Sequence, residues 1–244
     1  MNYQIKSLCH PGAIRDNNED AISCGVNKEL SIVWMLVADG MGGHNAGEVA
    51  SALLVTHMKQ ALTGLCKIPA HWSSWISEQF HHANLVIIKQ AKKTPAQQGM
   101  GTTGILMIVS KNTCHIGWVG DSRAYSLKAN VLVQETVDHT MLQELVNQGA
   151  ITAETARSSK SRNLLSQAIG VRENISVDTQ TIAINKGDTL MLSTDGLHDY
   201  LTEHDICRYL SEFSINKNLC HDMVNQAMTN SSRDNLTVGL INFN

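Results

Sequence analysis

The chain has 244 residues, of which 43% are hydrophobic and 17% are charged, and its net charge is −3. These values are typical of a folded globular protein and exclude a disordered chain, while the weak negative charge argues against nucleic acid or an anionic membrane as a partner. The first residues lack a secretory signal pattern, and the longest apolar run, 32–38, is too short to span a bilayer, so we expect a soluble cytoplasmic protein.

The predicted strands are short runs rich in β-branched residues. In chain order they cover 31–38, 103–109, 113–119, 124–127, 131–136, 189–193 and 236–241. The part from 103 to 136 is predicted to form a meander of neighbouring strands, with turns at Lys111-Asn112, at Gly120-Asp121 and at 128–130.

The predicted helices cover 46–62, 72–91, 141–148, 205–212 and 219–229. The first carries apolar residues near the 3.6-residue period, and Gly149 follows the third in the place of a C-terminal cap. Because strands are grouped with strands and helices with helices, we expect a layered α+β fold rather than a parallel βαβ sheet. The chain has no long linker and no internal repeat, so a single domain over residues 1–244 is predicted.

Three aspartates stand at the ends of predicted strands. Asp39 follows one apolar run, Asp195 follows another, and Asp234 comes just before a third. Any one of them alone is well explained as a turn residue, since Asp-Gly after a strand is a common turn signal. Three together, with a fourth at Asp121, favour a shared divalent cation, because Mg²⁺ and Mn²⁺ prefer oxygen ligands on rigid supports.

Two loops carry further signals, each weak by itself. The glycine-rich stretch DGMGGHNAG, residues 39–47, leads into a predicted helix and suits close approach of a ligand to the backbone, although it is neither a P-loop nor a dinucleotide-binding motif. The stretch RDNNED begins at Arg15. It is either a solvated charged loop or a functional one. In the second case the Arg15 guanidinium would bind phosphate in bidentate fashion, with Glu19 or Asp20 near the cations.

The chain resembles a known family through eight motifs in order: RDNNED, VADGMGGHNAGEVAS, GTTG, VGDSRAY, DHTMLQELVNQGAIT, NLLSQAIG, LMLSTDGLHDYL and RDNLTV. Together they are similar to the bacterial PPM (PP2C-type) metal-dependent serine/threonine protein phosphatases. The resemblance runs from about residue 3 to the end of the chain. It implies a four-layer αββα sandwich, in which two antiparallel sheets are flanked by antiparallel helices, with a two-ion Mn²⁺ or Mg²⁺ site at one edge.

The resemblance also implies a role for each matched residue. Asp39 would bridge the two ions, Gly40 would offer its carbonyl oxygen, and Asp195 with Asp234 would complete the ligands of one ion. Glu19 or Asp20 would hold water ligands of the other ion. Asp121 would bind a third, weaker ion together with Asp195, and Arg15 would grip the substrate phosphate.

The implied reaction is direct hydrolysis of phosphoserine or phosphothreonine by a hydroxide that bridges the two ions, without a phosphoenzyme. The proton donor for the leaving alkoxide is open. His44, in the glycine-rich stretch, is one candidate because histidine titrates near neutral pH, and the alternative is a loop residue that shapes the site. A flap beside the active site is expected at about 146–170. There the family often has His-Pro, and this chain has Ser159-Lys160-Ser161 instead, so substrate choice is expected to differ.

The expected partners are a phosphorylated protein substrate and, as functional opponent, a bacterial serine/threonine kinase. One pathway that the resemblance implies is the threonine-phosphorylation switch of type VI secretion. Nucleic acid and membranes are not expected as partners, and the expected state is a monomer. Two alternatives remain open: a catalytically silent regulatory or binding module of the same fold, and a phosphatase of a small phosphorylated molecule.

Overall fold

A computed structural model describes residues 2–42, 46–159, 161 and 163–244. Its strands are β1 (Tyr3–His10), β2 (Asp20–Asn27), β3 (Ile32–Met41), β4 (Gly101–Thr102), β5 (Gly104–Ser110), β6 (Thr113–Val119), β7 (Arg123–Lys128), β8 (Val131–Gln134), β9 (Asp178–Ala183), β10 (Thr189–Ser193) and β11 (Leu236–Phe243). Its helices are α1 (Gly47–Thr63), α2 (Trp72–Lys93), the 3₁₀ turn η1 (Pro95–Gln97), α3 (Met141–Asn147), α4 (Ala153–Ser158), α5 (Asp195–His198), α6 (Glu203–Ser211) and α7 (Leu219–Thr229). Within the described ranges, no helix is both long and apolar enough to cross a membrane.

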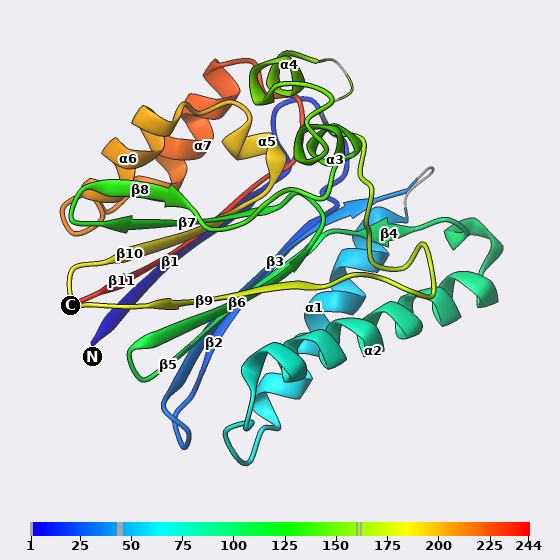
Figure 1. The fold of residues 1–244 in the computed structure, drawn as a ribbon, viewed down its shortest axis with the longest axis horizontal. Helices are drawn as coiled ribbons and strands as arrows, with labels where there is room; N and C mark the ends of the chain where they lie inside the picture. The colour runs from blue at the N-terminus through cyan, green and yellow to red at the C-terminus, as the bar shows by residue number, and fades with distance from the viewer. Residues whose placement is uncertain (1, 43–45, 160, 162) are drawn as a thin grey trace.

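Two antiparallel sheets pack face to face, with helices on the outer face of each (Figure 1). One sheet has the order β1-β11-β10-β7-β8, and the other has the order β2-β3-β5-β6-β9 with β4 beside β3. This is the four-layer αββα sandwich that the sequence predicted, and the prediction is confirmed.

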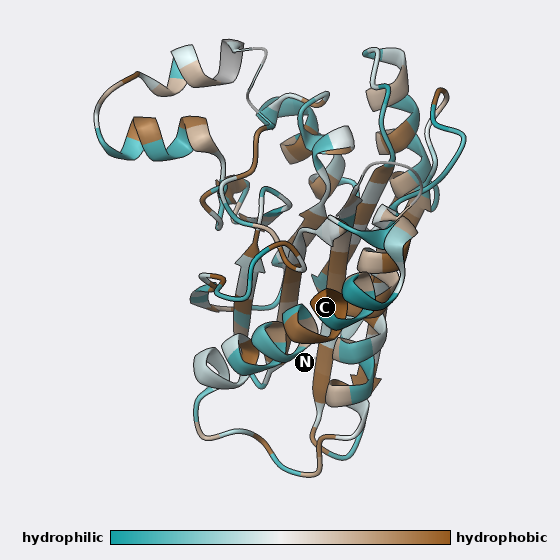
Figure 2. Cartoon of the chain, turned by 90° about the vertical axis from the view of Figure 1, so that its right-hand side faces the viewer, coloured by the Kyte–Doolittle hydropathy of each residue, from teal (hydrophilic) through white to brown (hydrophobic). Residues whose placement is uncertain are grey.

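Three apolar clusters hold the layers together. The inner cluster lies between the sheets and includes Met35, Met107 and Leu192. A second cluster packs α1 and α2 on the β2–β3–β5–β6 face, and a third packs α5, α6 and α7 on the other sheet. The strands accordingly carry much of the hydrophobic colour in Figure 2. Central strands such as β5 are buried along their whole length, which explains why they read as continuous apolar runs.

The predicted meander is wrong at its second turn. β5 pairs with β6, and β7 pairs with β8, but β6 and β7 belong to different sheets. The chain therefore crosses from one sheet to the other at Gly120-Asp121, where Gly120 has a φ of +104°. Such a crossing uses the same residue types as a hairpin turn, because both need a glycine in a left-handed conformation.

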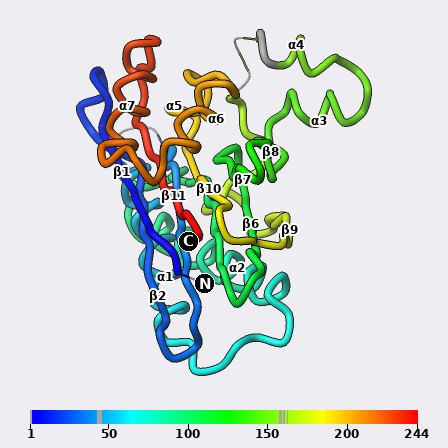
Figure 3. The backbone as a smooth tube through the Cα atoms, turned by 90° about the vertical axis from the view of Figure 1, so that its left-hand side faces the viewer, coloured from blue at the N-terminus to red at the C-terminus, as the bar shows by residue number. Residues whose placement is uncertain are grey.

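The segment after β8 leaves the sandwich and carries α3 and α4. We call residues 141–164 the flap, because a bridge between Thr140 and Leu165 closes its two ends. Figure 3 shows α3 and α4 projecting from the body of the molecule. The chain then rejoins the sandwich at Ile169, which exchanges two hydrogen bonds of 2.9 Å with Thr102. The start of each flap helix is capped by a threonine hydroxyl, from Thr140 and from Thr152, as helix N-termini require.

Candidate metal centre

The ends of four strands meet at one edge of the sandwich, and each brings an aspartate. Asp20 opens β2 and lies directly opposite Asp39 of β3. Side chains that are directly opposite in an antiparallel pair share a face of the sheet, so two carboxylates stand side by side at a position where like charges repel. From the other sheet, Asp195 follows β10, and Asp234 comes just before β11.

The Asp20 carboxylate links the two sheets. Its Oδ2 accepts hydrogen bonds from the hydroxyls of Thr194, at 2.9 Å, and Thr237, at 2.7 Å. Its Oδ1 is buried and, among the described residues, has no hydrogen-bond partner. A buried polar atom without a partner costs about 1–3 kcal/mol. The atom therefore calls for a partner from outside the chain.

Burial and crowding raise the pKa of these carboxyls. Burial lifts the pKa of Asp20 to about 7. Burial, with the charge of Asp234 as a second cause, lifts the pKa of Asp195 to about 6. The pKa values of Asp39 and Asp121 lie well above the usual range, mainly through burial and then through the neighbouring carboxylates. This edge of the sandwich therefore has too little positive charge to keep its carboxylates ionised, and a divalent cation would supply that charge.

Two of the other carboxylates, Asp234 and Asp195, already have protein partners. Asp234 Oδ2 accepts a hydrogen bond of 2.9 Å from the Arg15 guanidinium, whose side chain is about half exposed at 51%. Asp195 Oδ2 accepts one of 2.7 Å from the Asn163 amide at the end of the flap. Asp121, in the crossover between the sheets, is buried. The structure therefore places Arg15 and Asp121 beside the aspartates of the strand ends.

Glu19 and Gly40 meet at the start of α1. The Glu19 side chain accepts a hydrogen bond from the backbone of Gly47, the first residue of that helix, where a negative charge is favourable. The Gly40 N–H donates to the Glu19 carbonyl at 3.0 Å. A Cβ atom at Gly40 would stand 2.2 Å from the Gly47 carbonyl oxygen, so only glycine fits here.

These residues fit a site for hard divalent cations, although they do not by themselves form a complete set of ligands. Among the described residues, no three Asp, Glu, His or Cys side chains stand close enough together to enclose an ion on their own. Mg²⁺ typically keeps several water ligands and takes only one or two carboxylates from a protein. An all-oxygen set with one orphaned buried oxygen, Asp20 Oδ1, agrees with that preference. His44 lies outside the described residues.

Several residues of the site escaped the sequence analysis. Asn235 is buried, accepts from the Glu19 N–H at 2.8 Å and donates to the carbonyls of Pro11 and Asn17 at 2.9 Å. The Thr103 hydroxyl accepts a hydrogen bond of 3.0 Å from the Asp39 N–H, and the Thr103 N–H donates one of 2.8 Å to the Asp39 carbonyl. The only available signal was position, since these polar residues sit in the RDNLTV and GTTG motifs beside the aspartates.

Replacing Asn235 with alanine is expected to destabilise the protein by about 3 kcal/mol, because three part-buried hydrogen bonds to the backbone of Pro11, Asn17 and Glu19 are lost at once. Denaturant unfolding of the two proteins measures the loss. Asn230→Ala is a suitable control, because Asn230 is an exposed residue at the end of α7 and its loss should cost less than 1 kcal/mol. Equal stability of the Asn235 variant and wild type would contradict this account of the loop.

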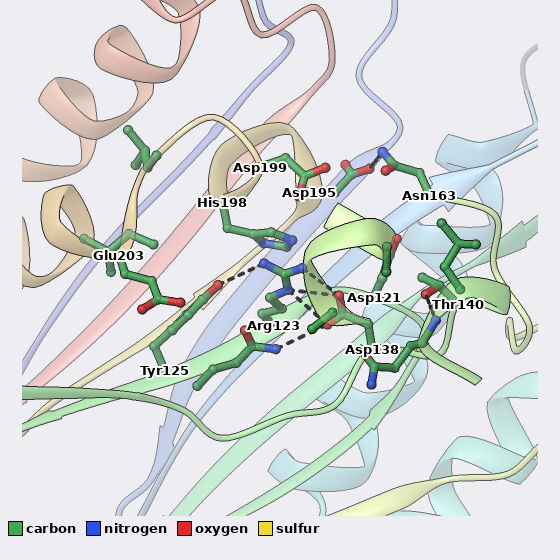
Figure 4. Close-up of a pocket in the computed structure, with 17 residues that line it drawn as sticks. Asp121, Arg123, Tyr125, Asp138, Thr140, Asn163, Asp195, His198, Asp199 and Glu203 are labelled. Carbon is green, nitrogen blue, oxygen red and sulfur yellow. Dashed lines mark hydrogen bonds and ion pairs between the residues drawn. The ribbon is translucent and has the colours of Figure 1, made fainter. Parts of the chain in front are cut away.

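A pocket of about 370 Å³ opens beside Asp121 and Asp195. The flap helices form one side of it, and α5 with the start of α6 forms another. Figure 4 shows Arg123 and Asp138 at its centre, with His198 close to the guanidinium.

Comparisons with known proteins agree with this arrangement. The family model for protein phosphatase 2C matches residues 14–231. The serine/threonine phosphatase stp of Listeria welshimeri is 34% identical over 235 residues, which cover 96% of this chain and 93% of that protein. The crystal structure of the serine/threonine phosphatase Stp1 from Staphylococcus aureus has a TM-score of 0.93 and 31% identity, covering 100% of this chain and 96% of that one.

Two further solved structures are similar to nearly the whole of this chain. The catalytic domain of the phosphatase PstP, in complex with two manganese ions, has a TM-score of 0.84 and 28% identity, covering 98% of this chain and 97% of that one. PppA, described as a key regulatory component of the type VI secretion system in Pseudomonas aeruginosa, has a TM-score of 0.81 and 27% identity, covering 99% of this chain and 98% of that one.

Proposed function

Because this chain belongs to the protein phosphatase 2C family, we propose that it removes phosphate from serine and threonine side chains of proteins with the help of two divalent cations at the sandwich edge. The chain is a protein serine/threonine phosphatase, since its named relatives are serine/threonine phosphatases over nearly their full length. The observation that carries the metal proposal is the buried, partnerless Oδ1 of Asp20 among carboxyls whose pKa values are raised.

We assign the ligands by their positions. Asp39 would serve both ions, Gly40 would contribute its carbonyl oxygen, and Asp195 with Asp234 would complete the ligands of one ion. Glu19 or Asp20 would hold water ligands of the second ion, and Asp121 with Asp195 would bind a third, weaker one. When bound, the ions lower the pKa of water and offset charge on the phosphoryl group. The manganese ions of PstP support Mn²⁺, with Mg²⁺ as the other ion of matching chemistry.

Arg15 is assigned to the substrate phosphate. Its guanidinium lies against Asp234, is about half exposed and comes from the loop before β2, so it can turn toward an incoming phosphate while staying near the carboxylates. A guanidinium binds two phosphoryl oxygens at once and stabilises the negative charge on them.

Arg15→Ala is expected to lower kcat/KM for a phosphothreonine peptide by about 10- to 100-fold, because a charged contact to the phosphoryl group is lost. Arg15→Lys should fall between this variant and wild type, since lysine keeps the charge and loses the fork. Thermal unfolding should stay near the wild-type value, as an exposed ion pair contributes about 0–1 kcal/mol. A kcat/KM of Arg15→Ala within twofold of wild type would show that Arg15 does not bind the substrate phosphate.

The proton of the leaving alkoxide is assigned to His44, which the glycine-rich loop carries five residues after Asp39. For His44→Ala, we expect a lower rate on phosphopeptide and the loss of one limb of the pH–rate profile. An aryl phosphate, whose leaving group needs no proton, should be hydrolysed almost as fast as by wild type. An unchanged rate and profile on phosphopeptide would assign His44 to loop structure instead.

The physiological opponent that we propose is a bacterial serine/threonine kinase, with the phosphatase acting as a single-domain monomer in the cytoplasm. Its flap is the expected place of substrate choice. The likeness to PppA supports type VI secretion as the pathway. The identity of the neighbouring genes tests this directly, because a kinase gene beside genes of that system would support it and an unrelated neighbourhood would count against it.

Manganese-dependent release of phosphate from p-nitrophenyl phosphate and from a phosphothreonine peptide tests the proposal as a whole. We expect both reactions, and both should stop when a chelator is added. No release from either substrate by folded protein would leave the catalytically silent module as the better description. Hydrolysis of the aryl ester alone would favour a small phosphorylated molecule as the natural substrate.

A further inference from the structure

His139 joins the crossover between the two sheets to the base of the flap, and it takes no part in the reaction proposed above. Both backbone groups of Gly120 are bonded to it, because the Gly120 N–H donates to His139 Nδ1 at 3.2 Å and the His139 N–H donates to the Gly120 carbonyl at 3.0 Å. The His139 carbonyl accepts from the Ser166 N–H at 2.9 Å, where the chain returns from the flap. The residue that follows Gly120 is Asp121, which is assigned to the third ion.

The surroundings of the His139 ring fix its orientation and its tautomer. The side chain is only 11% exposed, and its ring stacks on that of Trp118, with 6.2 Å between the centroids and 27° between the planes. Its Nε2 lies 3.4 Å from Oδ2 of Asp178, the first residue of β9. Because a backbone N–H can only donate, the bond from Gly120 requires the lone pair on Nδ1. The proton of the neutral ring is then on Nε2, toward the carboxylate.

The other side of the crossover is bonded to the two-ion centre. The hydroxyl of Ser122, one residue beyond Asp121, lies 2.7 Å from the hydroxyl of Thr103. That threonine hydroxyl accepts from the Asp39 N–H at 3.0 Å. The backbone that carries Asp121 is therefore held from two directions, by Thr103 on the side of the two ions and by His139 on the side of the flap.

The two neighbours of His139 make the same connection. Asp138 accepts hydrogen bonds from Nε and Nη2 of Arg123, at 2.7 to 3.1 Å, two residues beyond Asp121. Thr140 caps the N-terminus of α3 with its hydroxyl. The three consecutive residues 138–140 thus bind the crossover through the first two and the first flap helix through the third.

We propose that His139 is a positioning residue for the third ion, because it fixes the backbone on which Asp121 stands beside Asp195 and ties that backbone to the base of the flap. Losing a partner behind a metal ligand typically lowers metal affinity by about 10- to 100-fold, because the ligand is then less well ordered before the ion binds. Loss of the Nδ1 acceptor would also leave the N–H of the buried Gly120 unpaired. This inference rests on the proposed function and concerns the regulation of the same site.

Two amide substitutions separate the two nitrogens of the ring. In His139→Asn, the side-chain oxygen can take the place of Nδ1 and accept from Gly120. In His139→Gln, the amide lies near the place of Nε2 and leaves the Gly120 N–H without its acceptor. Calorimetric titration of the metal-free protein with Mn²⁺ measures each binding step. His139→Gln should weaken the third step by about tenfold and leave the first two near wild type, whereas His139→Asn should stay within about threefold of wild type in every step.

Hydrogen exchange at the Gly120 amide gives a second readout, because a hydrogen-bonded N–H exchanges slowly. This amide should exchange faster in His139→Gln than in His139→Asn. His115→Gln is the matched control, since His115 also stacks on a tryptophan, Trp72, and its Nδ1 lies 3.1 Å from the Thr181 hydroxyl, near the opposite end of β6 from the crossover. It should keep wild-type affinity for every ion.

Equal loss of the third step in both His139 variants would show that the ring matters only through its packing on Trp118. Wild-type affinity in His139→Gln would show that the ring does not position Asp121. Either result would overturn the proposal, and so would a wild-type titration without a third step, which would leave the two-ion phosphatase function standing. Failure of wild type with Mn²⁺ to hydrolyse a phosphothreonine peptide would instead overturn the phosphatase function, whatever the titration shows.

Discussion

Replacing Asp39 with asparagine is expected to abolish turnover, with kcat falling about a thousandfold or more. The reason is geometric, because Asp39 lies opposite Asp20 across the β2–β3 pair and within hydrogen-bonding reach of Asp195. This position is the reason that we assign Asp39 to both ions. An amide keeps the shape of the side chain and removes the charge that the cations need.

The fold of the Asp39 variant should survive. Without metal, the substitution removes an acid whose ionised form is disfavoured by burial and by the neighbouring carboxylates, so the melting temperature in chelator should equal or exceed that of wild type. Calorimetric titration with Mn²⁺ should show weaker binding. Asp222→Asn, on α7 where an asparagine oxygen can still accept from Asn216, is the matched control and should keep wild-type kinetics and metal affinity. A near-normal rate for Asp39→Asn would refute the metal centre as assigned.

The metal-free protein is expected to become more stable as the pH falls from about 7 toward about 4, the opposite of ordinary acid denaturation. Asp20 has a pKa of about 7 in the folded protein, against about 3.9 in an unfolded chain. Over this interval, the native state binds more protons than the unfolded state, so the free energy of unfolding rises as protons are added. Holding Asp20 ionised at neutral pH costs on the order of 4 kcal/mol, and Asp195, with a pKa of about 6, adds to the effect.

Thermal melts in chelator and in Mn²⁺ check this prediction. In chelator, the melting temperature should climb as the pH is lowered from about 7 to about 5, and in Mn²⁺ the protein should be most stable near neutral pH, because cations bind the ionised carboxylates. Metal-free Asp20→Asn should gain less than wild type on acidification. A metal-free melting temperature that falls steadily over the same interval would show that these carboxyls are ordinary in the folded protein.

Sequence reasoning predicted the metal centre at places where a carboxylate lies at the end of an apolar run. Asp39, Asp195 and Asp234 could be marked in this way because the pattern recurs three times, although each of them alone is well explained as a turn residue. The residues that hold Asp20 and the loop before it could not be found in this way. Asn235, Thr194 and Thr237 act through contacts with residues far away in the chain, and a single polar residue beside a strand looks the same whether it holds a carboxylate or faces water.

The layered arrangement of strands and helices could be predicted from the sequence. The edge strand β9 and the connection that crosses from one sheet to the other could not. The exposed edge strand β9 is polar along most of its length, so it lacks the apolar pattern that revealed β5 and β10. The crossover at Gly120-Asp121 was read as a hairpin because strand pairing is decided by long-range packing rather than by the turn residues.

The pairing of Asp20 with Asp39 across β2 and β3 makes the proposed metal centre depend on the register of these two strands. If β2 slipped by one residue, the alternation of side chains would turn every residue of that strand to the opposite face of the sheet. Asp20 would then point away from Asp39 and lose the hydroxyls of Thr194 and Thr237. In the metal centre that we propose, only this register would bring Asp20 and Asp39 together beside the cations, so cation binding would favour it over a shifted register. The two carboxylates that repel each other without cations would thus favour the native strand register once cations are bound.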